Sequence, residues 1–437
     1  MIKIFRFLFF MLILTAVSKN LLGNNSSSYL ISQQAFKNYD FFTVLNKFKI
    51  ENNKVDFQEY SKELFSATIT ENLILANEIA EKILSKDTLN QDAIMLYIVF
   101  NLKNNNLSDL DNFLLNYDLD QYELISFIFF HDDKFKNKKN ISKTLLELVK
   151  SYYNSTTSLE INFNYLLFYS SLAILLDENN YEAIYLKAEL YQLIQNYFVA
   201  DTYYNKIPQK SFYYKDAQKN IAFNSLKYLK FKEAENKIKK ILERNNDDKI
   251  IKKILADLYR INYNYNLAIN YYTELIKLND QDLWSLYYLR GICYERLDNW
   301  EMAEKDFLES LSINPDAPDV LNYLAYGWIE KNIFIERSLE MLKKAYEGNP
   351  SSYYILDSLA WAYYKKNNLK KAADLMEKVI DMAPGESISL DHLGDIYFAM
   401  NRKREAIYFW NQAIDLADSD DDLIKKINKK LEKYNAG

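Results

Sequence analysis

The chain has 437 residues, of which 49% are hydrophobic and 26% are charged, so it can bury a large core and is too apolar for global disorder. It contains only 7 glycines and 5 prolines, and no glycine lies between Gly23 and Gly291. β-Sandwiches, barrels and nucleotide-binding loops need such residues at their turns, so the composition argues against these folds and favours helices. The formal net charge of −6 argues against nucleic acid as a ligand.

Residues 1–18 have the pattern of a signal peptide. Lys3 and Arg6 precede an apolar run from Phe7 to Val17, which has the length of a signal-peptide core and is short for a membrane span. We therefore expect a signal peptide, or an uncleaved anchor, and in either case a remainder outside the cytoplasm. Residues 19–56 are expected to form a linker and the first irregular helices.

Residues 57–180 predict helical hairpins whose phase is irregular. Ala76 and Ala80 mark one candidate hairpin, and another begins at Gln91. The next regular start, Tyr181, follows Gln91 by 90 residues, which is not a multiple of 34, so the phase breaks between about 120 and 180. Helices are expected there around 145–153 and 163–176.

Small residues recur at a period of 34–35 residues over 181–420, which predicts seven repeats. The spacing favours two helices per repeat, with a small residue wherever the pair crosses closely and a bulky residue beside it. One such hairpin cannot bury its apolar face alone, so neighbouring hairpins must stack. The small residues expected to pack in the best-defined repeats are Gly291, Ala303, Ala325, Ala360, Ala372, Gly394 and Ala406.

The last segment, 421–437, predicts a capping helix. Asp420 to Asp422 lie at its start, and Lys425, Lys430 and Lys433 are among the lysines that follow. Acid at the N-terminal end and base toward the C-terminal end suit the helix dipole, and a polar outer face would close the stack.

The repeated residues resemble the tetratricopeptide repeat (TPR) family. Segments 321–326, 357–364 and 391–395 are similar to exported TPR proteins of Gram-negative bacteria. The resemblance implies an all-α fold, an α-solenoid of TPR helical hairpins forming a right-handed superhelix, with divergent TPR-like hairpins in 57–180. It also implies that the activity is binding rather than catalysis.

In this resemblance the first helix of each repeat lines a concave groove, which is expected to carry an aromatic and acidic strip. Such a strip would suit a peptide or a helix of a protein partner. Trp361 and Tyr326 are the side chains expected to be most exposed there, although packing between neighbouring repeats is an open alternative for these aromatics. The expected groove residues are Tyr288, Asn322, Tyr326, Tyr354, Asp357, Trp361, Tyr364, Asp391, Asp395 and Phe398.

The sequence offers little for catalysis. It has two histidines, His131 and His392, in no metalloprotease motif, and one cysteine, Cys293, which suits a core position. No metal and no cofactor are therefore expected. An alternative is an accessory subunit or enzyme with an unrecognised site in 120–180, where His131, Asp132 and Asp133 would be the first candidates. A self-assembling structural protein is a further alternative.

The resemblance, together with the N-terminal pattern, implies a protein-interaction scaffold of the bacterial cell envelope that performs no catalysis. Its expected partners are envelope-assembly proteins, without nucleic acid, and it would touch a membrane only through an uncleaved N-terminal segment. The expected location is periplasmic, with a possible tether to the inner membrane.

Overall fold

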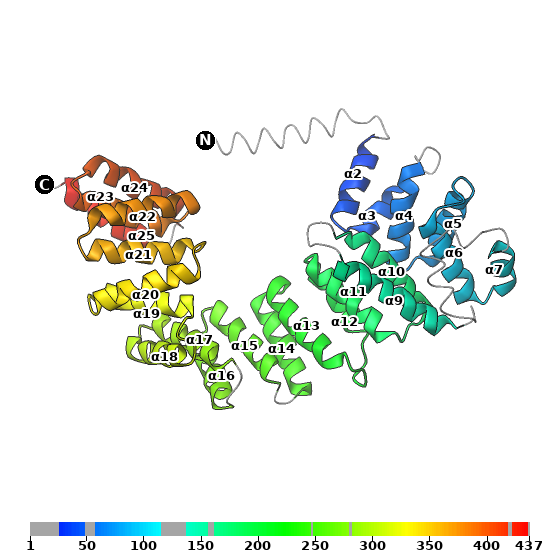
Figure 1. Cartoon of the computed structure of the whole chain (residues 1–437), viewed down its shortest axis with the longest axis horizontal. Helices are drawn as coiled ribbons and strands as arrows, with labels where there is room; N and C mark the ends of the chain where they lie inside the picture. Colours follow the sequence, from blue (N-terminus) through cyan, green and yellow to red (C-terminus); the bar gives the residue numbers. More distant parts are fainter. Residues whose placement is uncertain are drawn as a thin grey trace. The chain divides into compact units, whose positions relative to one another are not determined.

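Helices account for all the regular structure in the described part of the chain. The computed structural model describes residues 26–48, 57–114, 137–155, 161–245, 248–278, 282–417 and 422–435. These ranges contain 23 helices and no strand, as the glycine-poor composition predicts (Figure 1). The expected signal segment at 1–18 and the candidates His131, Asp132 and Asp133 lie outside the described residues.

The chain divides into two compact units, residues Met1–Lys230 and Phe231–Gly437, which are called unit 1 and unit 2 below. In unit 1, successive helices pack mostly as hairpins. Its helices are α2 (Ser26–Lys37), α3 (Phe41–Phe48), α4 (Phe57–Ile69), α5 (Leu73–Leu84), α6 (Gln91–Asn104), α7 (Leu107–Leu114), α9 (Lys138–Ser155), α10 (Phe163–Leu176), α11 (Tyr181–Leu193), α12 (Tyr197–Tyr204) and α13 (Tyr214–Tyr228).

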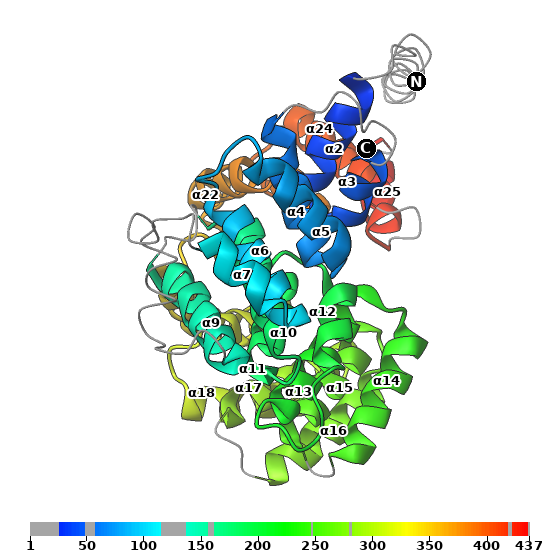
Figure 2. The same ribbon diagram turned by 90° about the vertical axis from the view of Figure 1, so that its right-hand side faces the viewer.

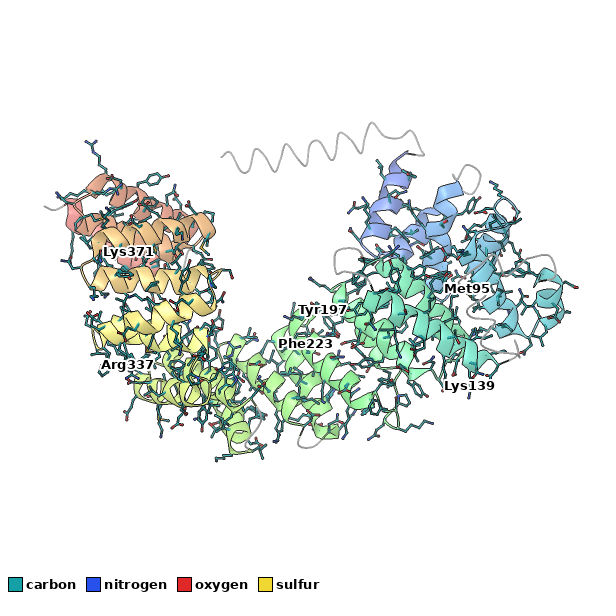
Figure 3. All side chains as sticks on the ribbon, viewed as in Figure 1. Met95, Lys139, Tyr197, Phe223, Arg337 and Lys371 are labelled. Carbon is teal, nitrogen blue, oxygen red and sulfur yellow. The ribbon has the colours of Figure 1, made fainter. Side chains whose placement is uncertain are left out.

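Helix α10 is the centre of unit 1. All of its residues from Leu166 to Leu176 are buried, and it packs against α4, α6, α9 and α11. Helices α9, α10 and α11 lie side by side in both views (Figures 1 and 2). Met95 of α6, labelled in Figure 3, is fully buried in the same unit. The helices expected around 145–153 and 163–176 are therefore present as α9 and α10, and they pack together.

Unit 2 is a row of helical hairpins followed by one last helix. The first helix of each hairpin is called helix A and the second helix B. The pairs α15–α16, α17–α18, α19–α20, α21–α22 and α23–α24 each pack closely, and consecutive pairs also contact one another. The helices are α14 (Phe231–Arg244), α15 (Lys249–Ile261), α16 (Tyr265–Lys277), α17 (Leu283–Arg296), α18 (Trp300–Ile313), α19 (Pro318–Glu330), α20 (Ile335–Gly348), α21 (Tyr353–Lys365), α22 (Leu369–Met382), α23 (Ser387–Ala399), α24 (Lys403–Leu416) and α25 (Asp422–Asn435).

Asparagine begins many of these helices. Its side-chain oxygen accepts a hydrogen bond from a backbone N–H of the first turn, which would otherwise lack a partner. The chain's many asparagines therefore have a direct structural use. The residues that cap in this way are Asn72, Asn90, Asn162, Asn180, Asn196, Asn299 and Asn368.

The seven small residues expected at helix crossings are all buried. The two glycines among them face large aromatic side chains of helix B. A Cβ atom at Gly291 would lie 2.7 Å from the Phe307 ring, and one at Gly394 would lie 2.4 Å from the Trp410 ring. Glycine is thus needed at these two positions because the neighbouring helix approaches too closely for any side chain.

The turns inside the hairpins, by contrast, are made without glycine. Ten residues with side chains have a positive φ, and none of the described glycines does. Among the described residues they lie in nine turns between the two helices of a hairpin; nine of them follow the end of the first helix, and Phe334 is the N-cap of the second helix, α20. These residues are Tyr39, Glu71, Asn105, Gln195, Tyr263, Asp298, Asn332, Phe334, Asn367 and Asn401.

Within the described ranges, no helix combines the length and the apolar character that a membrane crossing requires.

Candidate functional site

Four successive A helices of unit 2, α17, α19, α21 and α23, line a groove of about 830 Å³. This unit 2 groove is rich in tyrosine and in carboxylates. Six carboxylates face two basic side chains, Arg296 and Lys331. The lining residues are Tyr288, Glu295, Arg296, Asp298, Trp300, Asp319, Asn322, Tyr323, Tyr326, Gly327, Glu330, Lys331, Tyr353, Tyr354, Asp357, Ser358, Glu386, Ile388, Ser389 and His392.

Half of the expected groove residues line this groove, namely Tyr288, Asn322, Tyr326, Tyr354 and Asp357. Tyr354 is 42% exposed and its hydroxyl donates a hydrogen bond to Asp319 Oδ1 at 2.8 Å. Tyr288 packs edge-on against Tyr323, with ring centroids 5.6 Å apart. These contacts tie neighbouring A helices together and present the tyrosine rings as the groove wall.

The expected exposure of Trp361 is wrong. Its side chain is only 6% exposed because the next hairpin covers it. The indole stacks on His392 and on Tyr364, with ring centroids 4.1 and 4.6 Å apart, and its Nε1 donates to Glu330 Oε1 at 2.7 Å. Trp361 and Tyr364 therefore join α21 to its neighbours and do not line the groove, whereas Tyr326 is partly exposed and does line it.

Asp391 and Asp395 also lie outside the groove lining, because the last helix supplies them with a cation. Lys430 of α25 places its ammonium 2.6 Å from a carboxylate oxygen of each. Burial and the neighbouring Asp391 raise the pKa of Asp395, while Lys430 and a hydrogen bond from Trp410 oppose the rise. Phe398 is 43% exposed and packs beside Trp410.

Asp357 forms a buried pair with His392, the residue 35 positions further along. His392 Nδ1 lies 2.8 Å from Asp357 Oδ1. Burial lowers the pKa of His392, but the charge and hydrogen bond of Asp357, together with Asp391 and Asp395, outweigh it and raise the pKa above its usual value. The charged form of this histidine is thus held by carboxylates on α21 and α23.

Polar atoms of the groove residues remain without a hydrogen-bond partner. Asp357 Oδ2 and Asn322 Oδ1 are buried acceptors that no donor contacts. Trp300 Nε1 is a buried donor that no acceptor contacts. Asp357 and Asn322 are 7% and 6% exposed. Buried polar groups usually have partners, so these atoms mark the groove as a place where a ligand can complete the bonding.

Sequence reasoning missed several groove residues, among them Tyr323, Ser358 and His392. They follow Asn322, Asp357 and Asp391 by one position, so each lies beside an expected groove residue on the same helix. The period of 34–35 residues was the available signal, because one such residue predicts the position of the others.

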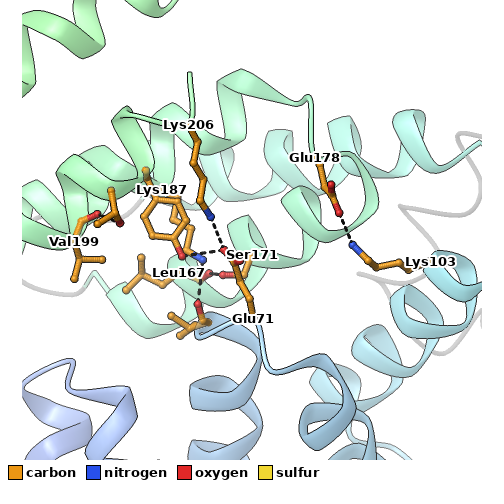
Figure 4. Close-up of polar contacts among 11 residues, drawn as sticks. Glu71, Lys103, Leu167, Ser171, Glu178, Lys187, Val199 and Lys206 are labelled. Carbon is orange, nitrogen blue, oxygen red and sulfur yellow. Dashed lines mark hydrogen bonds and ion pairs between the residues drawn. The ribbon is translucent and has the colours of Figure 1, made fainter. Parts of the chain in front are cut away.

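A second polar cluster lies in unit 1 around Lys187, which is fully buried (Figure 4). Its Nζ donates to the carbonyl oxygen of Ile69 at 3.1 Å and lies 4.4 Å from the centre of the Tyr203 ring. Burial lowers the pKa of Lys187 to about 7; Glu71 opposes the shift and Lys206 adds to it. Lys187 does not line the unit 2 groove.

The described residues hold no group of three or more histidine, cysteine, aspartate and glutamate side chains placed to bind a metal ion. The single cysteine, Cys293, is buried, and burial raises the pKa of its thiol to about 12.

Comparison with known proteins identifies the repeats. Residues 284–317 and 334–387 match two family models, each described as tetratricopeptide repeat. A TPR repeat-containing protein of Pseudomonas aeruginosa is 30% identical over 99 residues, which cover 23% of this chain. The match spans only 17% of that relative's length.

Solved structures with similar folds are more distant in sequence. A tetratricopeptide repeat protein from Parabacteroides merdae is 19% identical, and the match covers 57% of this chain and 97% of that one, with a TM-score of 0.45. Yeast Tom70 is 16% identical, with coverage of 93% and 96% and a TM-score of 0.39.

Proposed function

We propose that this chain is a protein-interaction scaffold of the bacterial cell envelope, because residues 284–317 and 334–387 match tetratricopeptide repeat models. It binds a peptide or a helix of a partner in the unit 2 groove and performs no catalysis. The single observation that carries the proposal is this groove, which runs across four A helices and combines tyrosine rings with buried, unpartnered polar atoms. Tyrosine gives a large contact area at low entropic cost, which suits a peptide ligand.

The cell-envelope location rests on the N-terminal sequence. Lys3 and Arg6 ahead of the apolar run Phe7 to Val17 form an export signal, and export places the repeats in the periplasm, free or tethered to the inner membrane. A fusion of residues 1–25 to a reporter enzyme that is active only outside the cytoplasm tests this. Activity is expected, and it should disappear when Lys3 and Arg6 are replaced by glutamate or when Leu12 and Leu14 are replaced by arginine.

The binding function is tested by affinity capture from the envelope fraction of the source cells. The bait is the chain without residues 1–18, compared with a Tyr326→Ala/Tyr354→Ala variant of the groove. The matched control is Tyr408→Ala, because Tyr408 is 56% exposed on the B helix α24, outside the groove. We expect a partner that the wild type and the control retain and the groove variant loses. Equal capture by all three baits would contradict a role for the groove.

A further inference from the structure

The charge of the unit 2 groove selects a class of partner. Its six carboxylates outnumber its basic side chains, Arg296 and Lys331, even when His392 is counted with them; the carboxylates belong to Glu295, Asp298, Asp319, Glu330, Asp357 and Glu386. Tyrosine rings stand between these acids, and the face of an aromatic ring attracts a cation. A groove lined in this way concentrates positively charged ligands and repels acidic ones.

Three groove oxygens lack a hydrogen-bond partner, Glu295 Oε2, Asn322 Oδ1 and Asp357 Oδ2, and the last two narrow the chemistry of the ligand further. Asn322 Oδ1 and Asp357 Oδ2 are both acceptors, so the group that completes them must be a donor. Asn322 on α19 and Asp357 on α21 hold the same position in consecutive repeats, 35 residues apart, and the two helices pack together. Both side chains are more than nine-tenths buried, so a donor must push neighbouring groove side chains aside to reach these oxygens, and the tip of a long side chain does this more readily than a peptide backbone.

The next repeat supplies an internal precedent. Asp391 follows Asp357 by 34 residues and holds the equivalent position on α23. There the ammonium of Lys430 bridges Asp391 and Asp395 at 2.6 Å from each, and it also lies 5.6 Å from the centre of a Trp410 ring. In this repeat, the two carboxylates and the Trp410 ring therefore bind a cation of the chain itself, the ammonium of Lys430 on α25.

We propose that the unit 2 groove recognises an arginine side chain of its partner, whose guanidinium donates to Asp357 Oδ2 and Asn322 Oδ1. This inference rests on the proposed function and names the partner's chemistry. Arginine fits because its planar fork can donate to two separate oxygens at once and can stack on tyrosine. His392 occupies the other oxygen of Asp357 and so leaves Oδ2 for the ligand.

The test measures binding of fluorescein-labelled peptides to the chain without residues 1–18. The probe is Gly-Leu-Ser-Arg-Leu-Ser-Arg-Leu-Gly, compared with a peptide that has citrulline, the neutral isostere, in place of both arginines. A third peptide has glutamate at those positions. We expect the citrulline peptide to bind about tenfold more weakly than the arginine peptide and the glutamate peptide more weakly still.

The decisive variant is Asp357→Asn, which keeps the shape of the side chain and removes its charge. It should weaken binding of the arginine peptide about tenfold and leave the affinity for the citrulline peptide unchanged. Asp316→Asn is the matched control, because Asp316 is an exposed carboxylate outside the groove. If Asp357→Asn melts at a lower temperature than the wild type, Glu386→Gln takes its place, because Glu386 is an exposed groove residue. A smaller loss of affinity for the arginine peptide is expected for that variant.

Equal binding of the arginine and citrulline peptides, or an unchanged affinity in both groove variants, would overturn this inference. The proposed function fails separately, in the capture experiment with the tyrosine variants. A partner that depends on Tyr326 and Tyr354 but is insensitive to Asp357→Asn would leave the scaffold function in place and refute the arginine site.

Discussion

Lys187 shows how much one residue can set the pH response of unit 1. Its pKa of about 7 lies below the usual value of 10.5, because burial disfavours the charged amine. Between these two values the unfolded chain binds a proton that the folded chain does not, so the free energy of unfolding rises with pH. Below about pH 7 both states are protonated, and the full penalty of the buried charge remains.

Lys187→Met is therefore expected to stabilise unit 1 at pH 7.5. It should also remove the rise of the free energy of unfolding with pH, which is up to about 1.4 kcal/mol per pH unit between pH 7.5 and 9.5. Urea unfolding followed by far-UV circular dichroism measures both effects. Lys139→Met is the control, since Lys139 is an exposed residue of α9 that takes no part in the Lys187 cluster. A variant that is less stable than the wild type and keeps its slope would contradict the prediction.

Trp361 marks the limit of residue-level prediction. The period of the repeat placed Trp361 on helix A. It also placed Trp361 on the side of that helix that carries Asp357. Its exposure could not be predicted, because that depends on how far His392 and the next A helix extend over it. By contrast, Asn322, Tyr326 and Asp357 were predicted on the groove and line it, since their neighbours leave room there.

At the scale of the element, the sequence predicted where helices lie better than what they contact. The period of 34–35 residues, counted from the start expected at Tyr181, places the next starts near 215 and 249, and α11, α13 and α15 begin at Tyr181, Tyr214 and Lys249. Small residues at fixed spacing determine these starts, because only they permit the close crossings. The pairing of Asp391 and Asp395 with α25 was missed, since nothing in the repeat period extends to the capping helix.

The close crossing at Gly394 gives a direct test. Gly394→Ala places a methyl group 2.4 Å from the Trp410 ring, and overpacking of this kind usually costs about 1–3 kcal/mol. The midpoint of urea unfolding, followed by tryptophan fluorescence, should fall. Gly385→Ala is the control, because nothing lies within 4 Å of its added Cβ. Equal midpoints for the two variants would show that this crossing can relax freely.

Helix α25 is held by a buried ion pair as well as by apolar contacts, among them those of the fully buried Ile427. Lys430→Met leaves the carboxylate of Asp391, which is 1% exposed, without its cation, and breaking a buried pair costs about 3–5 kcal/mol. The melting temperature of unit 2 should fall strongly at pH 7, and should fall less at an acidic pH at which Asp395, whose pKa is raised, is protonated. Lys425→Met on the same helix should have little effect, because its bridge to Asp422 is exposed to solvent.

At the scale of the whole molecule, the two units carry different spectroscopic labels. All five tryptophans, Trp284, Trp300, Trp328, Trp361 and Trp410, belong to unit 2. Tryptophan fluorescence therefore reports unit 2 alone, whereas far-UV circular dichroism reports the helices of both units. Repeat arrays are stabilised by local and neighbouring interactions, so distant parts of them need not unfold together.

We accordingly expect the two probes to give different urea transitions. Lys187→Met should shift the part of the circular dichroism curve that has no counterpart in fluorescence, and Gly394→Ala should shift the fluorescence curve. Superimposable curves in the wild type and in both variants would show that the molecule unfolds as one cooperative body instead.

The hairpin turns have a consequence for how this protein can change over evolution. A side chain in the left-handed region costs roughly 1 kcal/mol relative to glycine, less for asparagine, and the ten positions include residues as bulky as Tyr263 and Phe334. At positions whose side chain makes no essential contact, one substitution by glycine would recover that free energy. Gains at turns that share no contact would largely add. The protein thus holds a distributed reserve of stability that could offset damaging mutations elsewhere, including changes in a groove under selection for a new partner.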